Sequence, residues 1–179
     1  MITMKKMISL MALLCVVLMP FAVTAETAAA AVNWEDVAPV IEAGEVAGSF
    51  YSIEDMGLKL WLPDGLEAFE VSEEDAAAGR YALLMDAEQT CAITIDAVYV
   101  EGMTLDQAYQ NAVANGMAEP EIVTVNGIDA LTYKDAANDL ASVVLVDTNC
   151  NMIIFSFMPI SAEGAELVFS FIAASIMPL

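Results

Sequence analysis

The chain has 179 residues, with 26 acidic residues against five basic ones and no histidine. Its net charge of −21 argues against proteins that bind nucleic acids or anionic bilayers, because a surface of that sign repels phosphate groups. The missing histidine excludes Ser–His and Cys–His nucleophile activation and imidazole ligation of zinc.

The first 25 residues have the pattern of a secretory signal peptide. Lys5 and Lys6 form the positive segment, Met7–Met19 is the apolar segment, and Ala25 supplies the small residue at the cleavage site. The apolar run is short for a membrane span, which needs about 20 residues. We therefore expect a secreted or extracytoplasmic protein with no stable membrane insertion after cleavage; the alternative is a retained anchor. Cleavage removes two basic residues and no acidic one, which changes the net charge to −23.

Residues 26–48 are expected to form an alanine-rich leader with a possible short helix. Asn33 can cap this helix, with Trp34, Val37 and Ile41 facing the core, and Pro39 is expected to interrupt it. A single domain is predicted over residues 49–179, because a mature chain of this length supports one hydrophobic core.

Most of the domain is predicted to consist of paired strands. The last pair, Leu140–Val146 and Met152–Met158, is the most apolar stretch after the signal peptide. In its second strand Phe155 and Phe157 alternate with Ile154 and Met158, so both faces are apolar and this hairpin belongs in the interior of a sheet. The other expected pairs are Phe50–Ile53 with Leu58–Leu62, Tyr81–Asp86 with Cys91–Val100, and Glu121–Val125 with Ile128–Lys134. Asn126–Gly127 joins the last two of these strands and favours a type I′ turn, because both central positions need a positive φ.

The chain between and after these pairs carries the helix signals. Residues 66–79 are expected to form a loop with one helical turn. Thr104 and Gln107 have the spacing of a capping box, and Gly116 can end the helix that follows. Ser161 can cap a final helix. The two longer helices are the expected covers for the two faces of the central hairpin. The fold class is therefore α+β, an antiparallel sheet of about six to eight strands with helices packed on its faces.

Three sets of residues are candidates for chemistry. Asp147, Asn149 and Asn151 have the spacing of the first ligands of a calcium loop, but Met152 and Met158 replace the glycine and glutamate that such a loop requires. They are weak metal candidates, and a polar hairpin turn is the better interpretation. Cys91 and Cys150 are either a possible disulfide or, respectively, a small buried hydrophobe and an inert thiol.

The third candidate is Asp96, which lies in the middle of a predicted strand. Its position indicates that this part of the strand face meets water; the alternative is a buried catalytic carboxylate.

The order of elements resembles the PsbP-like family over roughly residues 49–176. The phrases that carry the resemblance are Leu58–Pro63, Val125–Ala130 and the terminal Phe171–Ile176. That family includes the extrinsic photosystem II subunit and a Ran-binding nuclear import factor. The resemblance implies an α/β/α sandwich that works as a binding or accessory module without a shared catalytic centre. No functional residue of the family matches a position here. The chain is also similar to small secreted proteins of anaerobic Gram-positive bacteria.

These observations favour a secreted, non-enzymatic binding or accessory module with an unknown protein or cell-surface partner. We expect a monomer with no cofactor and no catalytic residue. Two alternatives stay open at this point: a carboxylate-dependent hydrolase, which needs two acids facing one cleft, and a calcium-stabilised surface protein.

Overall fold

The computed structural model describes residues 30–179, so the predicted signal peptide lies outside the described residues. An eight-stranded sheet has the strand order β1-β7-β8-β9-β10-β6-β5-β4. All neighbours in it are antiparallel except β1 and β7, which are parallel. Its strands are β1 (Ala30–Val32), β4 (Leu66–Phe69), β5 (Arg80–Asp86), β6 (Ala92–Tyr99), β7 (Ala118–Val125), β8 (Ile128–Asp135), β9 (Leu140–Val146) and β10 (Asn151–Met158).

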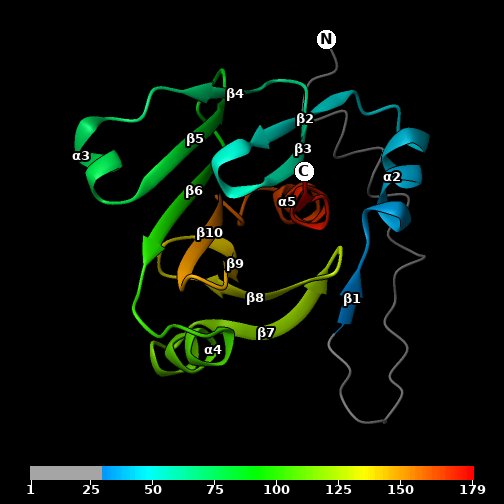
Figure 1. Ribbon diagram of the computed structural model, residues 1–179. Coiled ribbons are helices and arrows are strands. Elements are labelled where there is room, and N and C mark those ends of the chain that lie inside the picture. Colours follow the sequence, from blue (N-terminus) through cyan, green and yellow to red (C-terminus); the bar gives the residue numbers. More distant parts are fainter. Residues whose placement is uncertain (1–29) are drawn as a thin grey trace.

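A second, three-stranded antiparallel sheet has the order β11-β3-β2, with β2 at Gly48–Ile53, β3 at Leu58–Pro63 and β11 at Met177–Pro178. The helices are α2 (Trp34–Ala43), the short 3₁₀ helix η1 (Glu54–Met56), α3 (Glu73–Ala77), α4 (Leu105–Ala114) and α5 (Ala165–Ala174). The large sheet curves around α5, which lies on its concave face together with the small sheet, while α4 lies on the convex face (Figure 1).

The central hairpin lies where its sequence predicts. β9 and β10 pair with each other and are flanked by β8 and β6, so neither strand is at an edge. Phe155 and Phe157 are at most 1% exposed on the concave face. Their neighbours Met152 and Ile154 pack on the convex face against the cluster around α4. α5 therefore covers one face of the hairpin, as expected, and α4 covers part of the other.

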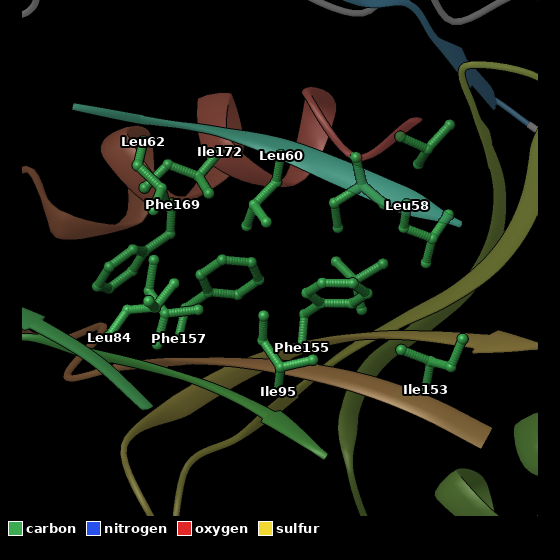
Figure 2. Close-up of a cluster of buried hydrophobic side chains, with 14 of the residues drawn as sticks. Leu58, Leu60, Leu62, Leu84, Ile95, Ile153, Phe155, Phe157, Phe169 and Ile172 are labelled. Atoms are coloured by element: carbon green, nitrogen blue, oxygen red, sulfur yellow. The ribbon is translucent and has the colours of Figure 1, made fainter. Parts of the chain in front are cut away.

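The main core fills the space between the concave face of the large sheet and the layer made by β3 and α5. Figure 2 shows the alternate leucines of β3, Leu58, Leu60 and Leu62, pointing toward the two phenylalanines of β10. Phe157 lies against Phe169 of α5, with ring centroids 5.4 Å apart. Burial of large apolar side chains such as these contributes about 1.5–3 kcal/mol each, so this layer contact dominates the stability of the fold.

Residues 30–48 belong to the fold rather than preceding it, which corrects the expected domain start at residue 49. β1 adds a parallel strand to β7. α2 continues to Ala43 through Pro39, where an interruption was expected. Pro39 is exposed, so water can solvate the carbonyl that the proline leaves without a hydrogen bond. Val37 and Ile41 hold the helix by packing in a second cluster around Trp61 and Phe171.

The expectation of a single sheet is also corrected. The pair of strands predicted at residues 50–62 forms the separate small sheet, and the last residues add β11 to it. The stretch predicted as a loop after residue 66 contains β4, which pairs with β5, and then α3, capped by Ser72. Local patterns showed that residues 50–62 were extended, but not that they would form a sheet of their own.

Asn126, in the tight turn between β7 and β8, ties both ends of the fold together. Its φ of 47° and the φ of 82° at Gly127 are typical of the expected type I′ turn. Its side-chain oxygen accepts the backbone N–H of Trp34 at 2.6 Å. Its side-chain amide donates to the carbonyls of Ala174 and Ile176, both at 2.8 Å. One asparagine therefore links the start of α2 to the end of α5.

Candidate functional site

A groove of about 370 Å³ crosses the convex face of the large sheet, and we take it as the candidate site. Its floor comes from the middle strands, and α3 and Met117, which lies between α4 and β7, contribute to its walls. Because α4 covers β7 and β8 and α3 lies beside β5, the strands between them keep part of this face open. The lining residues are Asp75, Ala78, Arg80, Asp96, Val98, Met117, Tyr133, Asp135, Leu140, Ser142, Ile154 and Ser156.

Two buried serines form the centre of the floor. Ser142 of β9 and Ser156 of β10 are opposite each other in the register, and their hydroxyl oxygens are 3.1 Å apart. They are 2% and 8% exposed. Two hydroxyls carry two protons, and their mutual hydrogen bond uses one. Within residues 30–179 no acceptor is found for the second proton, so the floor retains one donor for a ligand.

An ion pair continues the floor at the β5 side. Nε of Arg80 donates to Oδ1 of Asp96 at 2.5 Å, and the Thr94 hydroxyl donates to Oδ2 of the same carboxylate at 3.2 Å. Both charged side chains are half-buried, at 28% and 21% exposed. The terminal nitrogens of Arg80 make no hydrogen bond within residues 30–179, so they are further donors for a ligand.

The backbone around Gly79 positions Arg80. The Arg80 and Ala82 pairings with β6 are offset by a bulge, which re-aims the side chain at the strand end. Gly79 has a φ of 104°, and a Cβ placed there would lie 2.8 Å from the carbonyl oxygen of Ala97. Only glycine fits this close approach, so the sequence Gly79–Arg80 fixes where the guanidinium enters the groove.

Two further carboxylates line the groove, and each already has internal partners. Asp75 Oδ2 accepts the hydroxyl of Ser72 at 2.6 Å, within the cap of α3. Asp135 accepts the side-chain amide of Asn138 at 2.6 Å and two backbone N–H groups of the following turn. Chiefly the Asn138 amide, with those backbone donors, lowers the pKa of Asp135. A general acid needs the opposite shift, so Asp135 is not tuned for proton donation.

A second hollow of about 270 Å³ opens on the other face of the sheet, beside α5. Lys134 spans its mouth, with Nζ 2.8 Å from Glu119 and 2.5 Å from Glu166. Hydrogen bonds to Glu119 and Glu166, in that order, raise the pKa of Lys134. These exposed ion pairs link β8 to β7 and to α5, and all three charged groups are paired with one another. Surface pairs of this kind contribute little stability.

The predicted metal candidates form a hairpin turn. Oδ1 of Asp147 accepts the backbone N–H groups of Asn149 and Asn151 at 2.8 and 2.9 Å, and Oδ2 accepts the Asn151 side chain at 2.8 Å. These bonds, led by that of the Asn151 side chain, lower the pKa of Asp147. The carboxylate thus organises its own turn. Within residues 30–179 no three cysteine, aspartate or glutamate side chains gather closely enough to hold a metal ion.

The possible disulfide between Cys91 and Cys150 is corrected by the register. β6 and β10 pair Ala92 with Met158 and Tyr99 with Asn151, so the two cysteines follow opposite ends of an eight-residue ladder. At about 3.4 Å per residue they are more than 20 Å apart, whereas a disulfide needs about 4.4–6.8 Å between Cα atoms. Both thiols are free, and Cys91 is a buried member of the core.

Sequence reasoning found part of the groove. It singled out Asp96 as a residue on a face that meets water, and Asp96 is a half-buried floor residue. It missed Ser142 and Ser156, although Ser142 is the lone polar residue of β9 and Ser156 is the lone polar residue of the apolar run from Met152 to Met158. Two such serines in a predicted hairpin are a usable signal only once the register is known, because a shift by one residue puts them on opposite faces. Nothing in the local sequence indicated that Arg80 would pair with Asp96.

None of the helices within residues 30–179 is long and apolar enough to cross a membrane. The sequence matches no protein-family model and no curated protein. Among solved structures, the fold is similar to that of the cyanobacterial PsbP protein CyanoP from Synechocystis sp. PCC 6803. The superposition covers 75% of this chain and 94% of that one, with a TM-score of 0.54 and 13% sequence identity. At this identity the likeness concerns the fold alone, and the chain has a PsbP-like fold.

Proposed function

We propose that this protein is a secreted, non-enzymatic binding or accessory module that uses the convex-face groove to hold its partner. The observation that carries the proposal is that the aspartates lining the groove are already ion-paired or hydrogen-bonded to other residues of the protein. Asp96 is paired with Arg80, and the carboxylates of Asp75 and Asp135 are held by neighbouring side chains and turns. The groove therefore offers donors and acceptors for binding without a free acid and base for proton transfer.

The location in a secreted compartment rests on the sequence of the first 25 residues, with their positive start, apolar run and small-residue cleavage site. The PsbP-like fold supports a binding role at the level of architecture only, because a fold hosts many functions. The acidic surface supports solubility outside the cell and disfavours anionic partners.

One experiment compares binding and turnover on the same variants. Ala78, the residue that follows α3, is exposed and lines the groove, whereas Ala76, exposed within α3, does not line it. Ala78→Trp fills the groove, and Ala76→Trp is the matched control. We expect a partner captured from host culture medium on immobilised protein to be lost with Ala78→Trp and retained with Ala76→Trp.

The rival function is a carboxylate-dependent hydrolase, favoured by the fact that three aspartates line one hollow. It predicts turnover of a glycoside, ester or peptide substrate that disappears in the isosteric Asp96→Asn variant. Such turnover, together with partner capture that ignores Ala78→Trp, would replace the binding proposal with the hydrolase.

A further inference from the structure

We infer that the groove takes an extended, basic peptide segment of the partner protein. The inference rests on the proposed binding function and names the chemistry of its ligand. Three properties of the groove carry it: its length across the strands, the sign of its charge, and the donors left free on its floor.

The groove is elongated across the strands. Its floor runs from Tyr133 in β8 through Ser142 in β9 and Ser156 in β10 to Asp96 in β6 and Arg80 in β5. Neighbouring strands are about 4.8 Å apart, so four spacings make a floor of about 19 Å. An extended peptide advances about 3.3 Å per residue, which gives room for roughly six residues. A compact metabolite would leave most of that length empty.

The charge of the groove selects a cationic occupant. Asp75, Asp96 and Asp135 line it against a single cation, Arg80. The surrounding surface adds to this field, because only Lys59 and Lys134 provide further positive charge within residues 30–179. Lys134 is already bound to two glutamates. Lysine or arginine side chains are attracted to such a site, and anionic ligands are repelled from it.

The floor suits a peptide backbone between those side chains. The spare proton of the Ser142–Ser156 pair and the terminal nitrogens of Arg80 can donate to peptide carbonyl oxygens. Leu140 and Ile154 line the same groove and give apolar contact for the methylene stems of lysine. Tyr133 is the one aromatic residue among the lining residues, so the groove lacks the stacked rings that a sugar-binding platform would offer.

Fluorescence anisotropy with defined probes tests the inference on the purified protein. The probes are a labelled octapeptide alternating lysine with valine, the same peptide with glutamate or serine in place of lysine, and a labelled neutral oligosaccharide. We expect the lysine peptide to bind in physiological salt and the glutamate peptide not to bind. Ala78→Trp should weaken the lysine peptide about tenfold or more, whereas Ala76→Trp should leave its affinity unchanged.

A charge variant separates groove binding from attraction to the whole acidic surface. Arg80→Gln keeps an N–H donor at this position but removes the positive charge and frees the Asp96 carboxylate, so the lysine peptide should bind several-fold more tightly. Lys59→Gln adds the same charge on the small sheet, away from the groove, and should change affinity little. Thermal unfolding of each variant confirms that it is folded before affinities are compared.

The outcomes are distinct. Lysine-peptide affinity that responds equally to both glutamine variants and ignores Ala78→Trp overturns the inference, because the binding is then to the general surface. Oligosaccharide or serine-peptide binding that is lost with Ala78→Trp also overturns it, while leaving the binding function in place. The proposed binding function itself is overturned by a different result: turnover that depends on Asp96, together with partner capture that Ala78→Trp does not change.

Discussion

Replacing Asn126 should destabilise the fold, because its side chain makes three hydrogen bonds to parts of the chain distant in sequence. Alanine removes the acceptor for the Trp34 N–H and the two donors to Ala174 and Ile176. Three hydrogen bonds at a net value of about 1 kcal/mol each give a loss of about 3 kcal/mol. The positive φ of 47° adds about 1 kcal/mol for a side chain that disfavours the left-handed region. We expect Asn126→Ala to lower the free energy of unfolding by about 4 kcal/mol, a large share of the roughly 5–15 kcal/mol of a typical domain.

Denaturant unfolding followed by tryptophan fluorescence measures this change directly. The chain has two tryptophans, and both lie in the cluster between α2, β3 and α5, with ring centroids 5.9 Å apart. The signal therefore reports on the region that Asn126 ties together. Asn126→Gly is the matched control, because glycine loses the same three bonds but tolerates the φ. It should cost about 3 kcal/mol, and the difference between the two variants should be about 1 kcal/mol.

Asn126→Asp adds a test of sign. The aspartate keeps an acceptor for Trp34 but turns a carboxylate oxygen toward two carbonyls, to which only its protonated form can donate. Its pKa in the folded state should therefore be raised. The stability contributed by the protonated form is full below the unfolded value of about 3.9 and is lost as pH rises through the folded value. A loss of less than about 1 kcal/mol in unfolding free energy for Asn126→Gly would refute the role given to this side chain. So would an Asn126→Asp variant whose loss of stability, relative to the unaltered protein, grows as the pH is lowered.

Three further results are expected. Ser175 is fully buried, accepts the Trp61 N–H at 2.7 Å and donates to the Ile172 carbonyl at 2.6 Å. Denaturant unfolding should therefore show that Ser175→Ala lowers the free energy of unfolding by about 1–3 kcal/mol. A smaller loss would mean that water or a shift of β3 replaces the bond. Burial, helped by the charge of Asp86, raises the pKa of Cys91 to about 11. Alkylation of the folded protein at neutral pH, followed by peptide mapping, should therefore find Cys150 modified and Cys91 unmodified. Equal labelling of the two cysteines would contradict the buried position of Cys91. The pKa of Asp147 is lowered, so its hydrogen bonds contribute their full stability above the unfolded pKa of about 3.9, and this stability is lost as the pH falls through the lower folded pKa. The difference in unfolding free energy between the protein and Asp147→Asn should therefore shrink as the solution is acidified; a difference that grows in acid would contradict the direction of the shift.

Strands, helices and turns could be predicted from the sequence where they depend on residues only a few positions apart. The Thr104 capping box is present with both of its hydrogen bonds, and the Asn126–Gly127 turn has the expected dihedral angles. The alternation in β10 predicted which phenylalanines face the main core. These features depend on residues a few positions apart, so periodicity and turn chemistry determine them.

What could not be predicted depends on contacts distant in sequence. Nothing near residues 30–32 indicates that they would pair in parallel with β7, and the apolar run of β3 does not show that it belongs to a second sheet. The same limit applies to the groove. Ser142 and Ser156 are 14 residues apart and Arg80 and Asp96 are 16 apart, so their meeting requires the complete strand order. The hypothesis that Cys91 and Cys150 form a disulfide was wrong for the same reason. Their spacing in the sequence does not show that they follow opposite ends of the paired strands β6 and β10.

The bonds made by Asn126 also bear on how the chain folds. They join positions 92, 48 and 50 residues apart, and the β1–β7 pairing spans a similar distance. Contacts of such sequence separation carry a large loop-closure cost and slow folding. The bonds to Ala174 and Ile176 can form only after α5 is in place, so the link between α2 and α5 closes late in folding. The side chain of Asn126 therefore completes the fold rather than starting it.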